Sequence, residues 1–375
     1  MPIPLPTPDS ELLEPPDAAE VAFLSRGVVT AVSGDTGLTE LQQILIGTMF
    51  EAMTGFPADL EPSPITPIEF AEGLAHRNEM FRSRILQVML LATLILRPLP
   101  DEVAERVGDF ARELSVDDGM LRVARDYAVG DLGIASVDFE RNGYTADWSP
   151  ASSAVLHTSR ELADAWELAI DDAELANRWR RLEDLEHGTL GRAISEFYRA
   201  RGFRYPGNPG SAPPLLAQHD WVHVIADYGS TVESELEVFA FIARANDDPR
   251  GFSLLAMVVS LFETGYLSHG AGLFEAYPDQ LSREGVAVRV ADAMRRGALV
   301  SGSVDFMSVD WFAHASEPLD AVRRRFGLVA KSPSALRNGS VGPFEQGGIS
   351  EFQLEEGQRL AAEEGRTYDT FGASL

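Results

Sequence analysis

Apolar residues recur at intervals of three and four over most of the chain, a spacing that places them on one face of an α-helix. No stretch shows the strict alternation that is typical of a half-buried strand. The pattern predicts an all-α fold, with helices at residues 39–53, 68–76, 81–97, 101–114, 118–129, 159–170, 172–185, 189–201, 214–228, 231–246, 252–264, 285–296 and 318–326.

Turn-rich stretches divide these helices into two groups. Residues 1–20 contain six prolines and predict a disordered, Pro-rich arm. The polar run 143–153 is rich in turn-forming residues, so we place a boundary near it, between helical domains at 21–148 and 149–333. Residues 334–375 are Gly-rich and polar, which predicts a weakly structured tail.

The composition narrows the classes of function. The chain carries a net charge of −27, from 58 acidic and 31 basic residues. This charge argues against nucleic-acid binding, which needs a basic face, and against electrostatic docking on an anionic leaflet. The chain has no cysteine, which excludes disulfides, thiol nucleophiles and thiolate ligands. Any bound metal must therefore be held by His, Asp or Glu.

The sequence shows no sign of targeting to a membrane or to export. The N-terminus lacks the basic and apolar pattern of a secretory signal or transit peptide. The most apolar run, from Ile85 to Leu96, is too short to span a bilayer and predicts a buried helix. We therefore expect a cytoplasmic protein, with peripheral membrane contact left open.

Residue types that bind metals gather in the predicted helix 214–228. At about 100° per residue, His223 lies about 40° and Asp220 about 100° from His219 around the helix axis, so the three side chains share one wedge. Histidines at i and i+4 on one face can share a metal ion, although the pair alone is as typical of an ordinary helix. Asp227 lies about 80° from His219, in the same wedge one turn later.

A further candidate ligand, Glu235, lies on the next predicted helix. Gly229 predicts the end of the first helix, and Thr231 is a suitable N-cap for the second. Glu235 shares a helix face with apolar residues, where a carboxylate is costly unless it is paired or bound to a cation. A tight turn would make the two helices antiparallel and bring Glu235 to the histidines. Zn²⁺ suits this set of ligands best, with Mn²⁺, Fe²⁺ and Mg²⁺ as alternatives.

The pattern His-Asp-x-x-His-x11-Glu resembles the signature of the ubiquinone (coenzyme Q) biosynthesis protein 4 family. Upstream, the run from Glu186 to Arg192 looks like that family's Gly-x-Leu-Gly segment, and residues 288–297 and 311–325 are similar to its closing helices. The resemblance covers about residues 155–330. It implies an all-helical fold, a groove for a polyprenyl lipid, and a bound metal, usually taken as zinc, with the ligands His219, Asp220, His223 and Glu235.

The resemblance also implies a function. The protein would act on the head group of a prenylated quinone precursor or related isoprenoid lipid, removing a ring carboxyl at C1 with hydroxylation there. A metal with an open position would polarise a head-group oxygen, and Asp227, where family members usually have glycine, is the candidate proton acceptor. The candidate groove residues, which plain core packing explains as well, are Val238, Phe239, Ile242, Leu254, Val258 and Phe262.

Alternatives to this enzyme remain. A non-catalytic lipid-binding scaffold that organises quinone or isoprenoid biosynthesis enzymes would hold the metal structurally, and a closed four-ligand shell would favour it. Residues 36–130 faintly resemble a TerB-like helical domain of tellurite resistance, although a generic helical bundle explains them equally well. Such a bundle could pair two copies into a homodimer, which no sequence feature decides.

Overall fold

The computed structural model describes residues 15–94, 96, 100–116, 172–209, 211, 217–245, 255, 281, 283–300, 302 and 304–375. Within these ranges every extended regular element is a helix, and β-structure is limited to isolated bridges. The all-α prediction is confirmed. None of the described helices combines the length and apolar composition that crossing a membrane requires.

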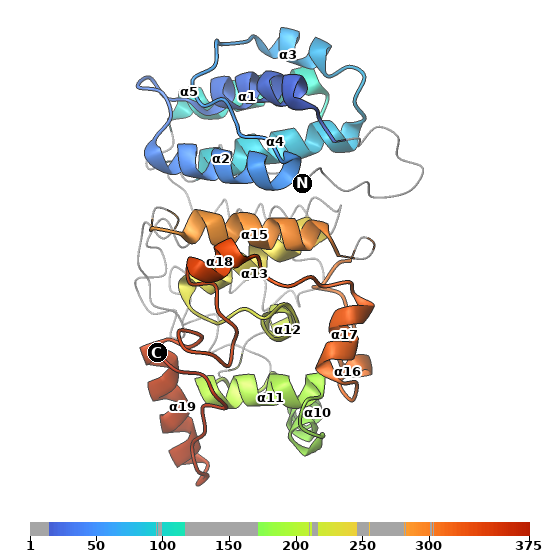
Figure 1. The fold of residues 1–375 in the computed structure, drawn as a ribbon, viewed down its shortest axis with the longest axis vertical. Coiled ribbons are helices and arrows are strands. Elements are labelled where there is room, and N and C mark those ends of the chain that lie inside the picture. The colour runs from blue at the N-terminus through green and yellow to red at the C-terminus, as the bar shows by residue number, and fades with distance from the viewer. Residues whose placement is uncertain are drawn as a thin grey trace.

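The first group of helices forms the upper part of the molecule in Figure 1. Phe70 lies at its centre, with its ring stacked on Phe23 at 5.4 Å and edge-on to Phe110 at 5.5 Å between centroids. Gly27 leaves the space for this ring, because a Cβ there would lie 2.2 Å from Phe70. The helices of the group are α1 (Ala18–Val32), α2 (Glu40–Thr54), α3 (Pro67–Gly73), α4 (Glu79–Leu94) and α5 (Asp101–Leu114).

The second group fills the lower part of Figure 1 and carries the predicted metal ligands. Its core is rich in aromatic rings, with Trp221 stacked on Trp311 at 6.3 Å. Its elements are α10 (Ala173–Arg180), the 3₁₀-helix η2 (Arg181–Asp184), α11 (Leu190–Arg201), α12 (Ala217–Ala226), α13 (Val232–Ala245), α15 (Val286–Ala298), α16 (Trp311–His314), α17 (Leu319–Arg325), α18 (Pro333–Arg337) and α19 (Glu351–Glu363).

Helix α15 joins the two groups. It packs along α13 on one side and against α2 on the other. Gly297 permits the close approach to α13, because a Cβ there would lie 2.3 Å from the carbonyl oxygen of Phe241. Helix α13, which carries the predicted ligand Glu235, therefore contacts the first group through α15.

Two sequence predictions need correction. Residues 334–375 do not form a weakly structured tail: they include α19, whose capping box at Ser350 and Gln353 starts a helix that packs on α11. The Pro-rich arm predicted for residues 1–20 extends too far, because α1 begins at Ala18, and α1 was itself not predicted. The predicted helices 118–129 and 159–170, most of 252–264, and the boundary near 143–153 lie outside the described residues.

Candidate metal centre

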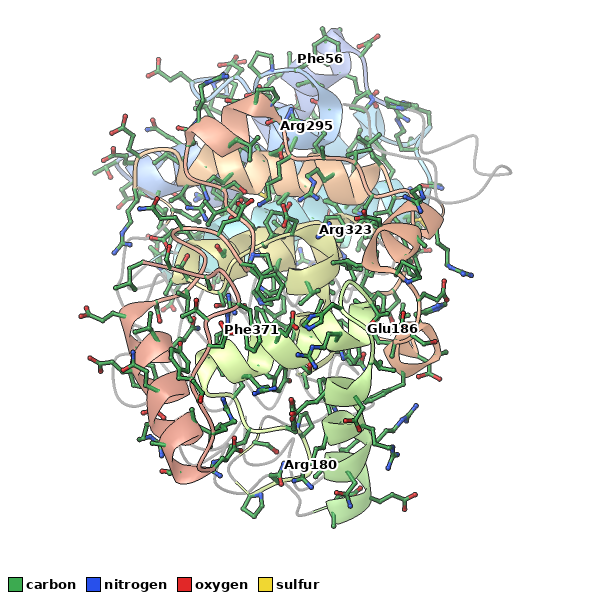
Figure 2. The ribbon with its side chains drawn as sticks, turned by 60° about the horizontal axis from the view of Figure 1, so that its bottom comes forward. Phe56, Arg180, Glu186, Arg295, Arg323 and Phe371 are labelled. Atoms are coloured by element: carbon green, nitrogen blue, oxygen red, sulfur yellow. The ribbon has the colours of Figure 1, made fainter. Side chains whose placement is uncertain are left out.

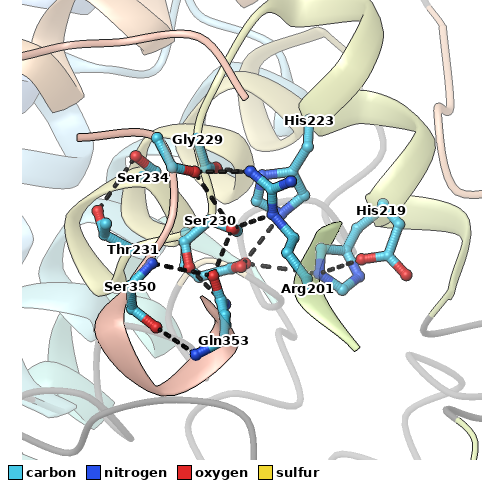
Figure 3. Close-up of polar contacts among 12 residues, drawn as sticks. Arg201, His219, His223, Gly229, Ser230, Thr231, Ser234, Ser350 and Gln353 are labelled. Atoms are coloured by element: carbon cyan, nitrogen blue, oxygen red, sulfur yellow. Dashed lines mark hydrogen bonds and ion pairs between the residues drawn. The ribbon is translucent and has the colours of Figure 1, made fainter. Parts of the chain in front are cut away.

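The candidate ligands come together at the junction of α12 and α13, where Figure 3 shows His219 and His223. His219, Asp220 and His223 lie on α12, and Glu235 lies in the first turn of α13. Their exposed fractions are 5%, 5%, 0% and 3%. Three of them, His219, His223 and Glu235, each offer a donor atom within 4.8 Å of the others, and they are the group within the described residues that can hold a metal ion.

The spacing of the donor atoms fits a shared ion. His223 Nε2 lies 3.1 Å from Glu235 Oε1, and His219 Nε2 lies 3.5 Å from Glu235 Oε2. Two ligands about 2.1 Å from a tetrahedral ion lie about 3.4 Å apart. Glu235 therefore presents one carboxylate oxygen to each imidazole at the distances that neighbouring ligands adopt.

The tautomer of His223 strengthens this interpretation. Its Nδ1 lies 2.6 Å from the carbonyl oxygen of Gly229, which accepts hydrogen bonds only, so Nδ1 carries the proton of the neutral ring. The lone pair of Nε2 then faces the carboxylate of Glu235. That nitrogen is buried and makes no hydrogen bond with the described residues. The contact with Glu235 therefore requires either a second proton on His223, which makes an ion pair, or a bound metal ion that both atoms share.

Aromatic rings hold both imidazoles. Phe197 of α11 stacks on His223 with centroids 5.4 Å apart, and Phe239 of α13 stacks on His219 at 5.2 Å. Phe239 was a candidate groove residue, and Val238 and Ile242 are likewise buried, at 0% and 2% exposure. The remaining groove candidates Leu254, Val258 and Phe262 lie outside the described residues, so the groove stays a prediction.

Asp220 occupies a different position from the other three. Its Oδ2 accepts a hydrogen bond of 2.5 Å from the hydroxyl of Tyr198, and its Oδ1 lies 3.5 Å from His219 Nε2. It is not a member of the group within 4.8 Å, so its role as a ligand stays a prediction. Burial raises the pKa of Asp220. Burial also acts to raise the pKa of Glu235, but His223 and His219 outweigh it and lower that pKa to about 2.

The C-terminal segment holds the turn between α12 and α13. Gly229 donates its backbone N–H to Val341 at 2.9 Å, and Ser230 donates its own to Gly348 at 3.1 Å. Gln353 of α19 accepts from the Ser230 hydroxyl at 2.7 Å and donates to the Ser230 carbonyl at 2.8 Å. The carbonyl that fixes the His223 tautomer therefore belongs to a turn held from outside the helix pair.

Arg201, at the end of α11, completes this support (Figure 3). Its guanidinium is buried, lies 3.9 Å from the Phe197 ring centroid, and donates to Ser230 Oγ and to the carbonyls of Pro343 and Gly348. Burial lowers the pKa of Arg201 to about 9, so the side chain stays charged at neutral pH. The sequence pattern did not predict Arg201 and Gln353, because Arg201 reaches Gly348, and Gln353 reaches Ser230, across more than a hundred residues.

Asp227 lies away from the predicted wedge. Helix α12 ends at Ala226, and Asp227 takes a left-handed conformation with φ of 65°. Its carboxylate pairs with Lys331 at 3.4 Å and Arg323 at 3.7 Å. The prediction of an uninterrupted helix through Asp227 is wrong, and this placement gives its predicted role as proton acceptor no support.

Comparisons with known proteins add little to this geometry. No family model and no curated protein matches the chain. One similar solved structure is that of a protein from Nostoc punctiforme that bears the name "putative ubiquinone biosynthesis protein". It is 18% identical, with a TM-score of 0.30, and the match covers 67% of this chain and 98% of that chain. A likeness this weak gives no evidence about function. The proposed function therefore rests on the geometry of the candidate site and on its sequence motif.

Proposed function

We propose that the protein binds one divalent metal ion through His219, His223 and Glu235 and uses it on an oxygen-bearing aromatic head group. The observation that carries the proposal is the buried contact of 3.1 Å between His223 Nε2 and Glu235 Oε1, a separation close to that of two neighbouring ligands of one ion. Two imidazoles and a carboxylate favour Zn²⁺ and also suit Fe²⁺ and Mn²⁺, whereas Mg²⁺ prefers an all-oxygen shell.

The proposed substrate is a prenylated quinone precursor or a related isoprenoid lipid. The support is the spacing His-Asp-x-x-His-x11-Glu, which resembles the ubiquinone biosynthesis protein 4 family. A bound metal would supply Lewis-acid polarisation of a carboxylate or phenolate oxygen, which favours loss of the ring carboxyl as carbon dioxide with a proton taking its place. Hydroxylation at that carbon would need an oxidant from outside the chain, such as dioxygen.

The chain's own residues have positioning roles in this proposal. Phe197 and Phe239 fix the imidazole planes and keep water from the donor atoms. Tyr198 holds the Asp220 carboxylate 3.5 Å from His219 Nε2, the nitrogen that also faces Glu235, so Asp220 would lie beside a bound ion. These contacts preorganise the site before an ion or a head group arrives.

A second candidate is a lipid-binding scaffold with a structural metal. It is favoured by the burial of all four candidate ligands and by the proximity of Asp220 Oδ1 to His219 Nε2, which would let Asp220 close the shell. Cobalt substitution separates the candidates, because an open position binds added 4-hydroxybenzoate and changes the visible absorption of Co²⁺. An unchanged spectrum at saturating 4-hydroxybenzoate favours the structural metal.

Elemental analysis of the purified protein tests the metal site itself. We expect about one equivalent of metal in the native chain and almost none in His219→Ala and Glu235→Ala. His187→Ala is the matched control, because that imidazole is 80% exposed and pairs with Glu196 at the surface. Full metal content in both site variants, with circular dichroism like that of the native chain, would reject the site.

Lipid extraction followed by mass spectrometry tests the substrate class. A co-purified prenyl compound that is lost together with the metal supports the proposed head-group chemistry. If the metal-loaded protein carries no lipid and takes up no added prenylated hydroxybenzoate, the proposed substrate class is wrong, although the metal site stands.

A further inference from the structure

A small cavity lies on the side of α11 that faces α10 and α19. It has a volume of about 90 Å³ and is lined by the end of α10, by η2, by the loop that follows α11 and by the turn that follows α19. A buried water needs about 10–15 Å³ of such space, so the cavity has room for several waters or for one small tetrahedral anion.

The cavity is basic in a strongly acidic chain. Four arginines line it, Arg180, Arg199, Arg204 and Arg366, against the two carboxylates of Glu183 and Glu364. These lining groups give four positive and two negative charges, and Glu363, which pairs with Arg204 at 3.1 Å, leaves an excess of one, whereas the whole chain carries −27. Arginines repel one another when they converge, and an anion placed among them removes that cost.

The cavity has more hydrogen-bond donors than acceptors for them. Arg199 reaches Glu183 Oε2 only at 3.4 Å, and the other Glu183 oxygen accepts a hydrogen bond of 3.0 Å from Tyr205. Arg199 Nε and Arg366 Nη1 are buried and make no hydrogen bond with the described residues. A buried charged donor without an acceptor costs about 1–3 kcal/mol or more, and one oxyanion offers acceptors to both guanidinium groups.

We propose that this cavity binds a phosphate group, either free phosphate or the phosphate of a small phosphomonoester, between Arg199 and Arg366. The planar guanidinium fork matches adjacent phosphate oxygens, and arginine is favoured wherever phosphate is bound bidentately. Arg180 lies at the same cavity and supplies further positive charge, as does Arg204 in part, because Arg204 also pairs with Glu363 at 3.1 Å. The site does not depend on the metal centre.

The proposal is tested by calorimetric titration of the full chain with inorganic phosphate, at constant ionic strength against chloride. We expect saturable binding at one site, weakened at least tenfold in Arg199→Gln and in Arg366→Gln. Arg295→Gln is the matched control: Arg295 pairs with Asp292 on α15, and Figure 2 shows it in the upper part of the view, with Arg180 at the bottom. We expect the control to bind phosphate as the native chain does.

Several outcomes would overturn the proposal. They are an absence of saturable binding in the native chain, an equal loss in Arg295→Gln, or unchanged binding in both cavity variants. Acetate that binds as tightly as phosphate would also overturn the assignment. Titration with glycerol phosphate distinguishes the two sources, because a phosphomonoester site binds it at least as tightly as inorganic phosphate.

Phosphate also binds metal ions, so the titration is repeated after chelation. Binding that survives chelation and is lost in Arg199→Gln supports the cavity, whether or not the metal proposal holds. Binding that disappears with the metal assigns the phosphate to the metal centre and overturns the cavity site.

Discussion

Among the described residues, helices α1–α5 bury no Asp or Glu side chain, whereas α12, α13 and α15 bury Asp220, Glu235, Glu237 and Asp292. The first group instead buries mainly neutral polar groups that bond to the backbone. Gln42, for example, donates to the carbonyls of Val32 at 2.9 Å and Ala92 at 3.0 Å. In the second group, Glu237 pairs with Arg289 at 2.7 Å and Glu235 with the two imidazoles.

The two groups therefore differ in their buried carboxylates: within the described ranges the first group buries none, whereas those of the second group need counter-charges. A buried carboxylate is tolerated only when an opposite charge or a cation compensates it. Removing a cation should therefore weaken the helices around the metal site and leave α1–α5 nearly unchanged. Residues 15–116 contain no tryptophan, whereas Trp179, Trp221 and Trp311 are buried in the second group, so tryptophan fluorescence does not report on the first group.

The largest expected effect is in the first group. Phe70→Ala removes a ring with 0% exposure that contacts Phe23 and Phe110, and should lower the free energy of unfolding by about 3–5 kcal/mol. Urea unfolding followed by circular dichroism measures this loss. We expect the same loss with and without a chelator, because no metal ligand lies near Phe70. A loss that depends on the chelator would show that the two groups share one metal-linked stability.

A smaller effect is expected from the C-terminal support of the metal turn. Gln353→Ala removes both hydrogen bonds to Ser230, which should cost about 1–3 kcal/mol and weaken metal binding about ten- to hundredfold. Competition with a metal-sensitive dye measures the affinity. Gln358→Ala is the matched control, because Gln358 is exposed on the same helix. Equal metal affinity in both variants would mean that α19 does not position the turn.

The elements that sequence predicted best are those with local signals. Helix α5 spans Asp101–Leu114, the predicted range. Its acidic first residue, Asp101, and the spacing of its apolar residues both indicate a helix that begins there. Helix α1 was missed because its sequence AAEVAFLSRGVVTAV mixes glycine and β-branched residues, which lower helix propensity, behind a run of prolines. Packing against α4 and α5 stabilises it, and no local pattern encodes that packing.

The residues of the candidate site also differ in whether a local sequence pattern predicts their positions. His219, His223 and Glu235 were found from spacing, because the periods of two neighbouring helices already place their donor atoms. The left-handed residue Asp227 was misplaced, because nothing in the sequence before it marks the end of α12 at Ala226. The support from Arg201 and Gln353 could not be predicted, since it depends on how distant segments dock.

In the metal-free protein, low pH should destabilise the second group of helices more than the first. The pKa of Glu235 is lowered to about 2, from an ordinary value of 4.5, so its contribution to stability is present above pH 4.5 and is lost as the pH falls towards 2. Tryptophan fluorescence should report this loss, and hydrogen exchange in α1–α5 should change less. The isosteric variant Glu235→Gln should lack the fluorescence change over that pH range. If it keeps the change, another group is responsible.

The smallest effect is expected at Asp227, the residue that links the metal helix to the chain around Lys331. Asn tolerates the left-handed conformation at φ of 65° and keeps the shape of the side chain, so Asp227→Asn removes only the charge. The pair with Arg323 joins two partly exposed side chains and contributes about 1 kcal/mol or less, and the buried ammonium of Lys331 keeps the attraction of Glu237 after Asp227 is neutralised. Metal content should stay at one equivalent, and unfolding should shift only slightly. Loss of turnover on a prenylated hydroxybenzoate at unchanged metal content and stability would restore Asp227 as the proton acceptor, and would place chemistry at the end of α12 rather than at the imidazoles.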